Sequence, residues 1–570
     1  MDKTPRLQEI QAELKHTPSS MGASPSVSLK SDVFEVTADP STSFDVIKTL
    51  KEKCGFAWFT DLCGVDYLDR DRPKRFEVVT HLYAPTSNTR IRIKVPVDEG
   101  ETIPTLIPLW KGANWFEREL WDMYGITVSG HPNLERILCH HKFVGHPLRK
   151  DYDAEKNCAL DEPLPIHFDP QDRPPEYQQE DELAAYQWIN IGPSHPATHG
   201  TLRIMAEVDG ENIVQSKLEI GYLHRCFEKM AETHKWNQVI PYTDRLNYMS
   251  APMNNVGYCR SVEKLLGIEV TPRAQVIRMI LSELSRIIDH LVCIGTNAVD
   301  IGALTSFWYC FEPREKVYTL FENLCGDRLT TSLTRVGGQA QELPRAWLKE
   351  CKQVVEFIEK RISMIDKLLT KNPIWMSRTR GVCALSKEDS IQYGFTGPLL
   401  RSVGVDFDLR KADPYYYYNQ MEFDIPIGVN GDTYDRYLVR MEEIRQSCRI
   451  LKQCIKNVPE GAIKVEDKRI SLPDKADVYN SIEGLMQHFM LVIHDVQVPE
   501  GEIYSYTEAA NGELGFYIVS NGTGKPWRVH CRAPSFCHFQ PFPEMIRGKL
   551  IADAVAGVGS LNIIAGELDR

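Results

Sequence analysis

The pattern of apolar and polar residues in the first part of the chain favours alternating strands and helices. Apolar runs of strand length lie at residues 34–36, 76–83 and 89–95. Segments with a helical period lie between and after these runs, at residues 45–53, 105–109 and 116–125. Such alternation is typical of a small α/β domain. We therefore predict an α/β domain over residues 28–152.

A longer period dominates the second part of the chain. Between Thr271 and Leu291 apolar residues recur every three or four positions, and Thr271 with Pro272 forms a helix start signal. The same period returns at residues 347–369 and 434–458, which predicts a central helical bundle. Strand-like runs flank this bundle at residues 202–208, 213–218, 515–520 and 527–532. The predicted fold class is α+β, with peripheral β-structure in the larger domain.

Two segments show no sustained period. Residues 1–27 are polar and contain several prolines, so we expect a mobile N-terminal tail. Residues 153–186 are rich in Pro, Asp, Glu and Gln, and such a segment buries too little apolar surface to fold alone. We interpret it as an acidic, Pro-rich linker, followed by a larger domain at residues 187–570.

The nearest candidate for a membrane-spanning helix, which needs about 18 or more apolar residues with few charges, is residues 291–311. It contains Asp300 near its middle and continues directly from the amphipathic helix before it. We therefore interpret it as a buried core segment of a soluble domain.

Composition and net charge exclude some classes of function. Hydrophobic residues make up 42% and charged residues 25% of the chain, values typical of a soluble globular protein. The net charge of -12 argues against nucleic acid as the main partner, because phosphate binding requires a surplus of Lys and Arg.

Fifteen cysteines are scattered singly, without any CxxC pair, and the N-terminus shows no signal peptide. This pattern favours reduced thiols in a cytoplasmic protein. We expect the chain to hold no iron–sulfur cluster or structural zinc of its own, because such sites need closely spaced ligands.

Candidate chemistry begins in a tight loop at residues 190–200 that carries His195 and His199 between glycines and prolines. Histidine can gain or lose a proton near neutral pH, so this loop suggests proton handling. The alternative is a pair of solvated or backbone-bonded histidines.

Two more residues stand out. Asp300 places a carboxylate in an apolar stretch, where it needs a cation or a donor, and a protonated histidine is a suitable partner. Tyr248 has a phenol that can donate a hydrogen bond to a strong base such as a reduced quinone oxygen. The alternatives are a carboxylate bonded at a helix end and an ordinary packed aromatic ring.

Four motifs of the larger domain resemble the D subunit of NADH-quinone oxidoreductase, respiratory complex I. They are Gly192-Pro-Ser-His-Pro-Ala-Thr-His-Gly200, Ile220-Gly-Tyr-Leu-His-Arg-Cys-Phe-Glu-Lys229, Pro241-Tyr-Thr-Asp-Arg-Leu-Asn-Tyr248 and Asp300-Ile-Gly-Ala-Leu-Thr305. The resemblance continues to the terminal Gly566-Glu-Leu-Asp-Arg570. The first domain is similar to the C subunit, through Glu117-Arg-Glu-Leu-Trp-Asp-Met-Tyr-Gly-Ile126, Gly130-His-Pro-Asn-Leu-Glu-Arg-Ile-Leu138 and Gly145-His-Pro-Leu-Arg-Lys-Asp-Tyr152. Together they resemble a fused C/D subunit, with the acidic linker where the two would join.

The resemblance implies a role at the quinone-reduction site of a proton-pumping enzyme that is not active as this chain alone. His199 and Tyr248 would donate to the quinone head-group, and Asp300 would pair with His199. Arg225 would lie near the terminal iron–sulfur cluster, which the partner B subunit holds. Further implied partners are the I and G subunits and the membrane H subunit. The implied location is peripheral, on the cytoplasmic side of the bacterial inner membrane.

The sequence departs from the family pattern at Cys226, where we expect a small glycine after Arg225. The D subunit is also related to the large subunit of nickel–iron hydrogenases, but Asn247 and Ser250 stand where that family has metal-binding thiolates. A remaining alternative is a purely scaffolding subunit of a related membrane-bound oxidoreductase or hydrogenase-type complex, in which the histidine loop serves packing alone.

Overall fold

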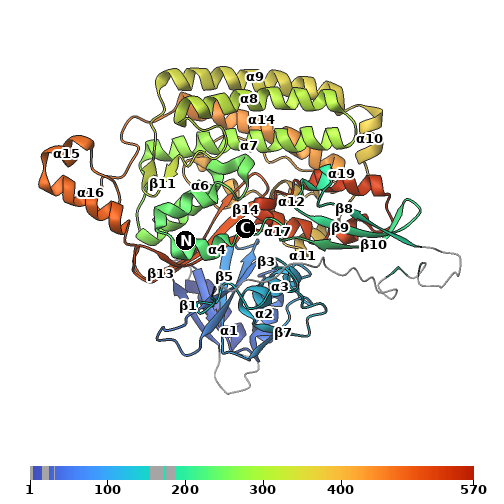
Figure 1. Cartoon of the computed structure of the whole chain (residues 1–570), viewed down its shortest axis with the longest axis horizontal. Coiled ribbons are helices and arrows are strands. Elements are labelled where there is room, and N and C mark those ends of the chain that lie inside the picture. Colours follow the sequence, from blue (N-terminus) through green and yellow to red (C-terminus); the bar gives the residue numbers. More distant parts are fainter. Residues whose placement is uncertain (1–3, 16–24, 31–32, 154–172, 175–176, 178–185) are drawn as a thin grey trace.

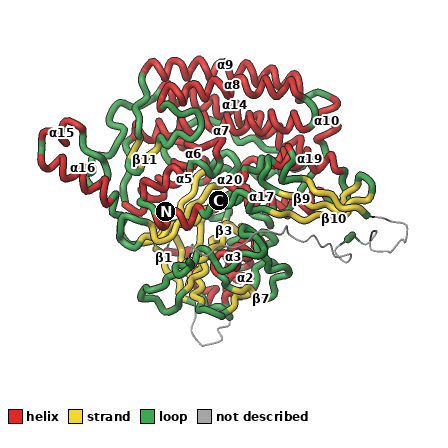
Figure 2. The backbone as a smooth tube through the Cα atoms, in the orientation of Figure 1, coloured by secondary structure: helices red, strands yellow, loops and turns green. Residues whose placement is uncertain are grey.

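The computed structural model describes residues 4–15, 25–30, 33–153, 173–174, 177 and 186–570. A sheet-containing unit built from the first part of the chain lies against a larger unit whose long helices are stacked on the far side (Figure 1). Most of the predicted linker at residues 153–186 falls outside the described residues. Helices dominate the larger unit, and strands dominate the smaller one (Figure 2).

The smaller unit is built on a five-stranded sheet with the strand order β1-β2-β5-β4-β3. The pair β2 and β5 is parallel, and the other neighbours are antiparallel. Its strands are β1 (Ser26–Lys30), β2 (Val33–Thr37), β3 (Trp58–Asp66), β4 (Phe76–Ala84) and β5 (Thr89–Val97). Its other elements are α1 (Thr4–Leu14), α2 (Ser43–Glu52), β6 (Thr102–Pro104), α3 (Ala113–Tyr124) and β7 (Thr127–Ser129). Mixed helix and strand content agrees with the predicted α+β class.

Two local predictions in this unit are wrong. The first is the mobile N-terminal tail, because α1 forms within it and buries Ile10 and Leu14 against the sheet unit. These two apolar residues are four positions apart and share one helix face, although the segment as a whole is polar. The helix expected at residues 105–109 is a turn, because Pro104 and Pro108 interrupt the backbone hydrogen bonds that a helix needs.

The long helices α7, α8, α9 and α14 pack side by side as the predicted bundle (Figure 1). They are α7 (Pro272–Asp300), α8 (Leu304–Cys325), α9 (Arg345–Leu369) and α14 (Thr433–Lys456). The start of α7 is as predicted: Pro272 occupies its first turn, and the hydroxyl of Thr271 accepts the Ala274 amide at 3.4 Å. Its polar face is also buried, since Arg278 pairs with Glu263 at 2.6 Å and His290 with Glu443 at 2.7 Å. Therefore α7 lies at the centre of the larger unit.

Shorter elements surround the bundle. The strands are β8 (Gln187–Ile191), β9 (Arg203–Asp209), β10 (Asn212–Glu219), β11 (Thr334–Arg335), β12 (Gly338–Gln339), β13 (Gly501–Glu508), β14 (Glu513–Ser520) and β15 (Pro526–Arg532). The α-helices are α4 (Phe227–Thr233), α5 (Ile240–Thr243), α6 (Ala251–Leu266), α10 (Pro373–Thr379), α11 (Lys387–Gln392), α12 (Gly397–Ser402), α13 (Leu409–Ala412), α15 (Lys475–Asn480), α16 (Ile482–His494), α17 (Pro534–Phe539), α18 (Phe542–Ile546), α19 (Ile551–Leu561) and α20 (Ala565–Leu568). Short 3-10 turns are η3 (Pro196–Thr198), η4 (Trp236–Val239), η5 (Tyr248–Ser250) and η6 (Tyr418–Gln420).

The apolar stretch at residues 291–311 is two helices rather than one buried segment. Gly302, with φ at +97°, lies between the end of α7 and the start of α8. Beyond this break Leu304 and Trp308 are 55% and 63% exposed, whereas Cys310 is buried, so the buried interpretation holds only for part of the stretch. Among the described residues, no helix is long and apolar enough to cross a membrane.

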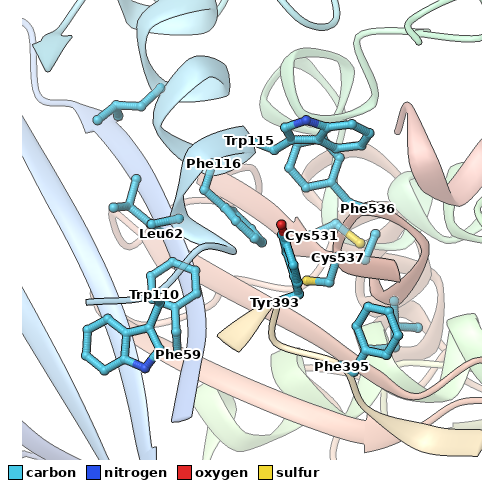
Figure 3. Close-up of a cluster of buried hydrophobic side chains, with 14 of the residues drawn as sticks. Phe59, Leu62, Trp110, Trp115, Phe116, Tyr393, Phe395, Cys531, Phe536 and Cys537 are labelled. Atoms are coloured by element: carbon cyan, nitrogen blue, oxygen red, sulfur yellow. The ribbon is translucent and has the colours of Figure 1, made fainter. Parts of the chain in front are cut away.

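One apolar core continues from the smaller unit into the larger one. Figure 3 shows Trp115 and Phe116 of α3 beside Phe536 of α17, and their ring centroids lie 5.3 and 5.1 Å from that of Phe536. Phe59 of β3 and Tyr393 belong to the same cluster. The two units therefore bury apolar surface against each other.

Ionic contacts, which we call the junction network, reinforce this apolar contact. Arg528 of β15 donates to Glu228 of α4 at 2.6 Å and to the Gly64 carbonyl of β3 at 3.1 Å. His530 bonds Asp61 of β3 at 2.9 Å and lies 2.8 Å from Glu228. The terminal Arg570 donates to Glu119 of α3 at 2.6 Å.

The junction network also contains the groups that could hold a metal, namely Asp61, Cys63 and His530, and Glu119, Glu228 and His530. The carboxylates of Asp61, Glu119 and Glu228 already accept hydrogen bonds from protein donors. The geometry of these groups is therefore that of a structural ion-pair network.

Candidate functional site

The histidine loop leads from β8 into η3 and on to β9. Its close packing requires glycine at position 192, where φ is +89° and a Cβ would lie 2.3 Å from the Leu202 carbonyl oxygen. The Thr198 hydroxyl lies 3.2 Å from the Pro193 carbonyl oxygen and 3.0 Å from that of His195, and donates toward them. These contacts hold the loop in a compact form.

The two histidines of this loop have different roles. His195 precedes η3, and its Nδ1 accepts the Ala197 amide at 3.2 Å, so this ring stabilises the turn. His199 ends η3 with φ at +54° and is exposed. In the part of the chain that the structure describes, the His199 ring makes no hydrogen bond. The sequence could not distinguish the two rings, and the structure leaves His199 available to a ligand.

Asp300 is the last residue of α7 and is half-buried. Burial raises the pKa of its carboxyl, and the nearby His199 and His195 oppose this rise. The helix α19 passes close by, since a Cβ on Gly559 would lie 3.2 Å from Oδ2 of Asp300. Because α19 also packs on η3, it links the histidine loop to the end of α7. No hydrogen bond or ion pair between the described side chains joins Asp300 directly to His199, so the coupling acts through space.

Tyr248 begins η5, which packs on α7. The preceding Asn247 fixes this turn, because its Oδ1 accepts the Met249 amide at 3.2 Å while its Nδ2 donates to Asp289 of α7 at 2.7 Å. The phenol of Tyr248 makes no hydrogen bond to any residue in the described ranges. Burial, followed by the Asp289 carboxylate, raises its pKa, which keeps the phenol protonated as a donor.

The Tyr248 part and the His199 part of the candidate site both lie along helix α7. Asp289 and Asp300 are eleven residues apart, which is about three helical turns or ~16 Å and places them on the same face of α7. Tyr248 lies against the Asp289 end and His199 near the Asp300 end. The three predicted residues, Tyr248, His199 and Asp300, therefore come from separate segments of the chain and lie along one helix. Among the described residues, no hydrogen bond joins Tyr248 to His199 or to Asp300.

Arg225 and Cys226 lie in a loop before α4. The Arg225 guanidinium donates to the Arg245 carbonyl at 3.1 Å, and burial together with the Arg245 charge lowers its pKa. Cys226 caps α4 with φ at +53°, a conformation that favours glycine and explains the glycine expected there. Burial raises the pKa of its thiol, so it remains protonated.

The C-terminus holds the Arg225 loop. The Asp569 carboxylate accepts the Gly221 and Leu223 amides at 3.0 and 2.8 Å, and the Arg570 carbonyl accepts the Arg225 amide at 3.2 Å. Sequence reasoning missed both Asp569 and Asp289. For Asp289 the signal was a carboxylate in a predicted helix rich in apolar residues. Asp569 lies in the terminal family motif at residues 566–570, but the motif alone did not show which segment this carboxylate would hold.

Comparisons with known proteins agree with the sequence motifs. A family model described as "Respiratory-chain NADH dehydrogenase, 49 Kd subunit" matches residues 300–570. A second, described as "Respiratory-chain NADH dehydrogenase, 30 Kd subunit", matches residues 36–157.

Curated relatives match along nearly the whole chain. A protein of Bdellovibrio bacteriovorus, named as the C/D subunit of NADH-quinone oxidoreductase, is 56% identical over 539 residues, which is 95% of each chain. Proteins of the same name from Ectopseudomonas mendocina and Pseudomonas paraeruginosa are both 41% identical, over 90% of this chain and 88% of theirs. The chain therefore belongs to the family of fused C/D subunits of NADH-quinone oxidoreductase, the oxidoreductase known as respiratory complex I.

Proposed function

We propose that this protein forms part of the quinone-reduction site of complex I, with His199 and Tyr248 as donors to the quinone head-group and Asp300 as the acidic partner of His199. Arg225 would lie beside the terminal iron–sulfur cluster of the B subunit, which supplies the electrons. The observation that carries this proposal is the gathering of these separate segments along α7, with both donors free of hydrogen bonds to described residues.

The charges of the site suit proton delivery to a quinone. Reduction to the quinol takes two electrons and two protons, and the two donors can each supply one proton. Tyr248 keeps its proton until a strong base forms beside it, because burial raises the pKa of the phenol. His199 lies within electrostatic range of Asp300, because a charge on this histidine opposes the rise in the pKa of the Asp300 carboxyl.

Loss of the His199 proton changes the state of Asp300. The positive histidine opposes the burial that raises the pKa of Asp300. When His199 becomes neutral, the carboxylate loses that stabilisation and either takes up a proton or remains an uncompensated, half-buried charge. Quinone reduction would thereby alter the charge at the end of α7 and in the adjoining turn to α8, which offers a local event for proton pumping to use.

The proposed assembly places this chain peripherally on the cytoplasmic side of the inner membrane. Its partners would be the B, I and G subunits and the membrane H subunit, and contact with the bilayer would come through them. Electrons must arrive through these partners, because the chain has no CxxC spacing for a cluster.

A double-mutant cycle on quinone reduction in assembled complex tests the pair. We expect His199→Ala to lower the turnover strongly, Asp300→Asn to lower it less, and the double variant to be little worse than His199→Ala alone. The matched control is His195→Asn, which keeps an acceptor for the Ala197 amide and should preserve most of the turnover.

Two results would overturn the assignment. Strictly additive losses in activation free energy would mean that His199 and Asp300 act independently. A loss for His195→Asn as large as that for His199→Ala, with assembly intact, would mean that the loop contributes its shape rather than a donor. The second result would favour the purely scaffolding alternative.

A further inference from the structure

An apolar stripe on α16 faces away from the body of the protein. The short hairpin of α15 and α16 projects from one end of the larger unit (Figure 1). At 3.6 residues per turn, one side of α16 carries a row of large apolar residues spaced by three and four positions. This α16 stripe consists of Ile482, Leu485, Met486, Phe489, Val492 and Ile493. Such a pattern normally faces a core, yet Ile482 is 78% and Phe489 58% exposed.

The opposite side of α16 is attached to the protein, so the outward direction of the stripe is fixed. Gln487 donates to the Lys468 and Ser471 carbonyls at 3.1 and 3.0 Å. The helix N-terminus is capped by Ser481, which accepts the Gly484 amide at 2.9 Å. Near the C-terminus, Lys235 donates to the Val492 carbonyl at 3.0 Å. Rotation of the helix to bury the stripe would break these bonds.

Charge and composition indicate which surface covers the stripe. A helix that lies on an anionic membrane normally carries Lys and Arg along its polar face, whereas α16 contains neither and has one glutamate, Glu483. Large flexible and aromatic side chains such as Met486 and Phe489 are typical of the centre of protein interfaces. The pattern of anchors at three and four positions is that of a helix seated in a groove.

We propose that α16 docks through this stripe into an uncharged, apolar groove on another protein subunit of the oxidoreductase. Membership of the C/D family implies such partner subunits, so the proposal does not depend on the quinone-site assignment. The hairpin is rooted beside η4, the turn that follows α4, since Asn237 of η4 bonds Asp495 through its side-chain amide at 2.7 Å. Docking at α16 would therefore hold a partner close to the segment that follows Arg225.

Hydrogen exchange on the unmodified protein gives the first test. The exchange of the α16 amides is compared between the purified chain and the assembled complex, and we expect at least about tenfold slower exchange in the complex. The purified chain should be monomeric by light scattering and should not bind vesicles of phosphatidylethanolamine and phosphatidylglycerol through α16. Equal exchange in both states would overturn the proposal, as would vesicle binding or dimer formation that depends on the stripe.

Matched variants give the second test. The double change Met486→Glu with Phe489→Glu should lower the yield of assembled complex by about tenfold or more, as expected for central interface residues. Met486→Leu with Phe489→Leu keeps the stripe apolar, and His494→Glu adds a negative charge outside it, so both should assemble normally. Melting curves of the purified variants establish that each is folded. Normal assembly of the folded double-Glu variant would refute docking through the stripe.

Discussion

The junction network and the proposed quinone site treat their ionisable groups in opposite ways. At the junction each buried charge has an opposite partner in contact, as in the 2.6 Å pair of Arg528 and Glu228. Along α7, the phenol of Tyr248 and the ring of His199 have no hydrogen-bonded partner among the described residues, and Asp300 interacts with histidines only through space. The two regions therefore differ in pairing rather than in the types of residue present.

This difference separates groups that hold a fixed charge in the junction from groups that are proposed to transfer protons at the quinone site. Close pairing holds two junction groups in their charged forms: the pKa of His530 rises to about 9 because Asp61 and Glu228 outweigh its burial, and that of Glu228 falls well below its ordinary value. Such groups keep their charge through physiological pH. The groups of the proposed quinone site have no such contact partner among the described residues, as the proposed proton transfer to a ligand requires.

Breaking one junction pair should have the largest effect on stability. Glu228→Gln removes the counter-charge of Arg528 and one of the two carboxylates that face His530, which keeps its bond to Asp61. Removing one partner of a buried pair costs about 3–5 kcal/mol in unfolding free energy. Glu101→Gln is the control, since it removes the partly exposed pair with Lys74 and should cost less than about 1 kcal/mol. Urea unfolding of the purified chains measures both. Equal losses would contradict the view that burial makes the junction important.

Removal of a polar group at the proposed quinone site should lower the rate of quinone reduction and leave the stability of the chain unchanged. Tyr248→Phe deletes a hydroxyl that has no hydrogen bond to described residues, so the unfolding midpoint should not change. Loss of one donor to a developing oxyanion lowers turnover by about 10²–10³-fold in favourable cases. The quinone-reduction rate of assembled complex is the measurement. An unchanged rate and quinone affinity would remove Tyr248 from the site.

The stability of the junction should depend on pH through His530. Its pKa is raised from 6.5 to about 9 by folding, so its stabilisation is complete below pH 6.5 and is lost as the pH rises through 9. A shift of this size corresponds to about 3 kcal/mol. The thermal unfolding temperature of the wild type should fall as the pH rises between these two values. The unfolding temperature of His530→Asn should depend less on pH in the same range. If the unfolding temperatures of the two proteins changed equally with pH, folding would not be coupled to protonation of His530.

The sequence predicted these two regions to very different degrees. Helical periodicity located α7, α9 and α14, and family motifs located His199, Tyr248, Asp300 and Arg225. The contacts that position these residues were not predictable, because Asn247 meets Asp289 across 42 positions and Leu223 meets Asp569 across 346. The junction network was missed for the same reason, since Arg528 and Glu228 are 300 positions apart. Periodicity reports which face of a helix is apolar, and it does not tell what covers that face, as α16 shows.

The smallest effect is expected at Cys226, which lies between the junction and the site. Its φ of +53° costs a residue with a Cβ about 1–2 kcal/mol, and a glycine there would avoid this strain. Glycine also gives up about 0.4–1 kcal/mol through the greater freedom of the unfolded chain. It further loses the thiol contact to His224 Nε2 at 3.6 Å. We therefore expect Cys226→Gly to raise the unfolding free energy by no more than about 1 kcal/mol.

The reverse change supplies the control for Cys226→Gly. Gly267 ends α6 with φ at +67°, and a Cβ there would meet nothing within 4 Å, so Gly267→Ala isolates the backbone strain and should destabilise the chain. Urea unfolding of both variants measures the difference. A clear loss of stability in Cys226→Gly would show that the buried thiol contributes more through packing than its backbone conformation costs. In that case the departure from the family pattern at Cys226 would be a stabilising feature of this chain.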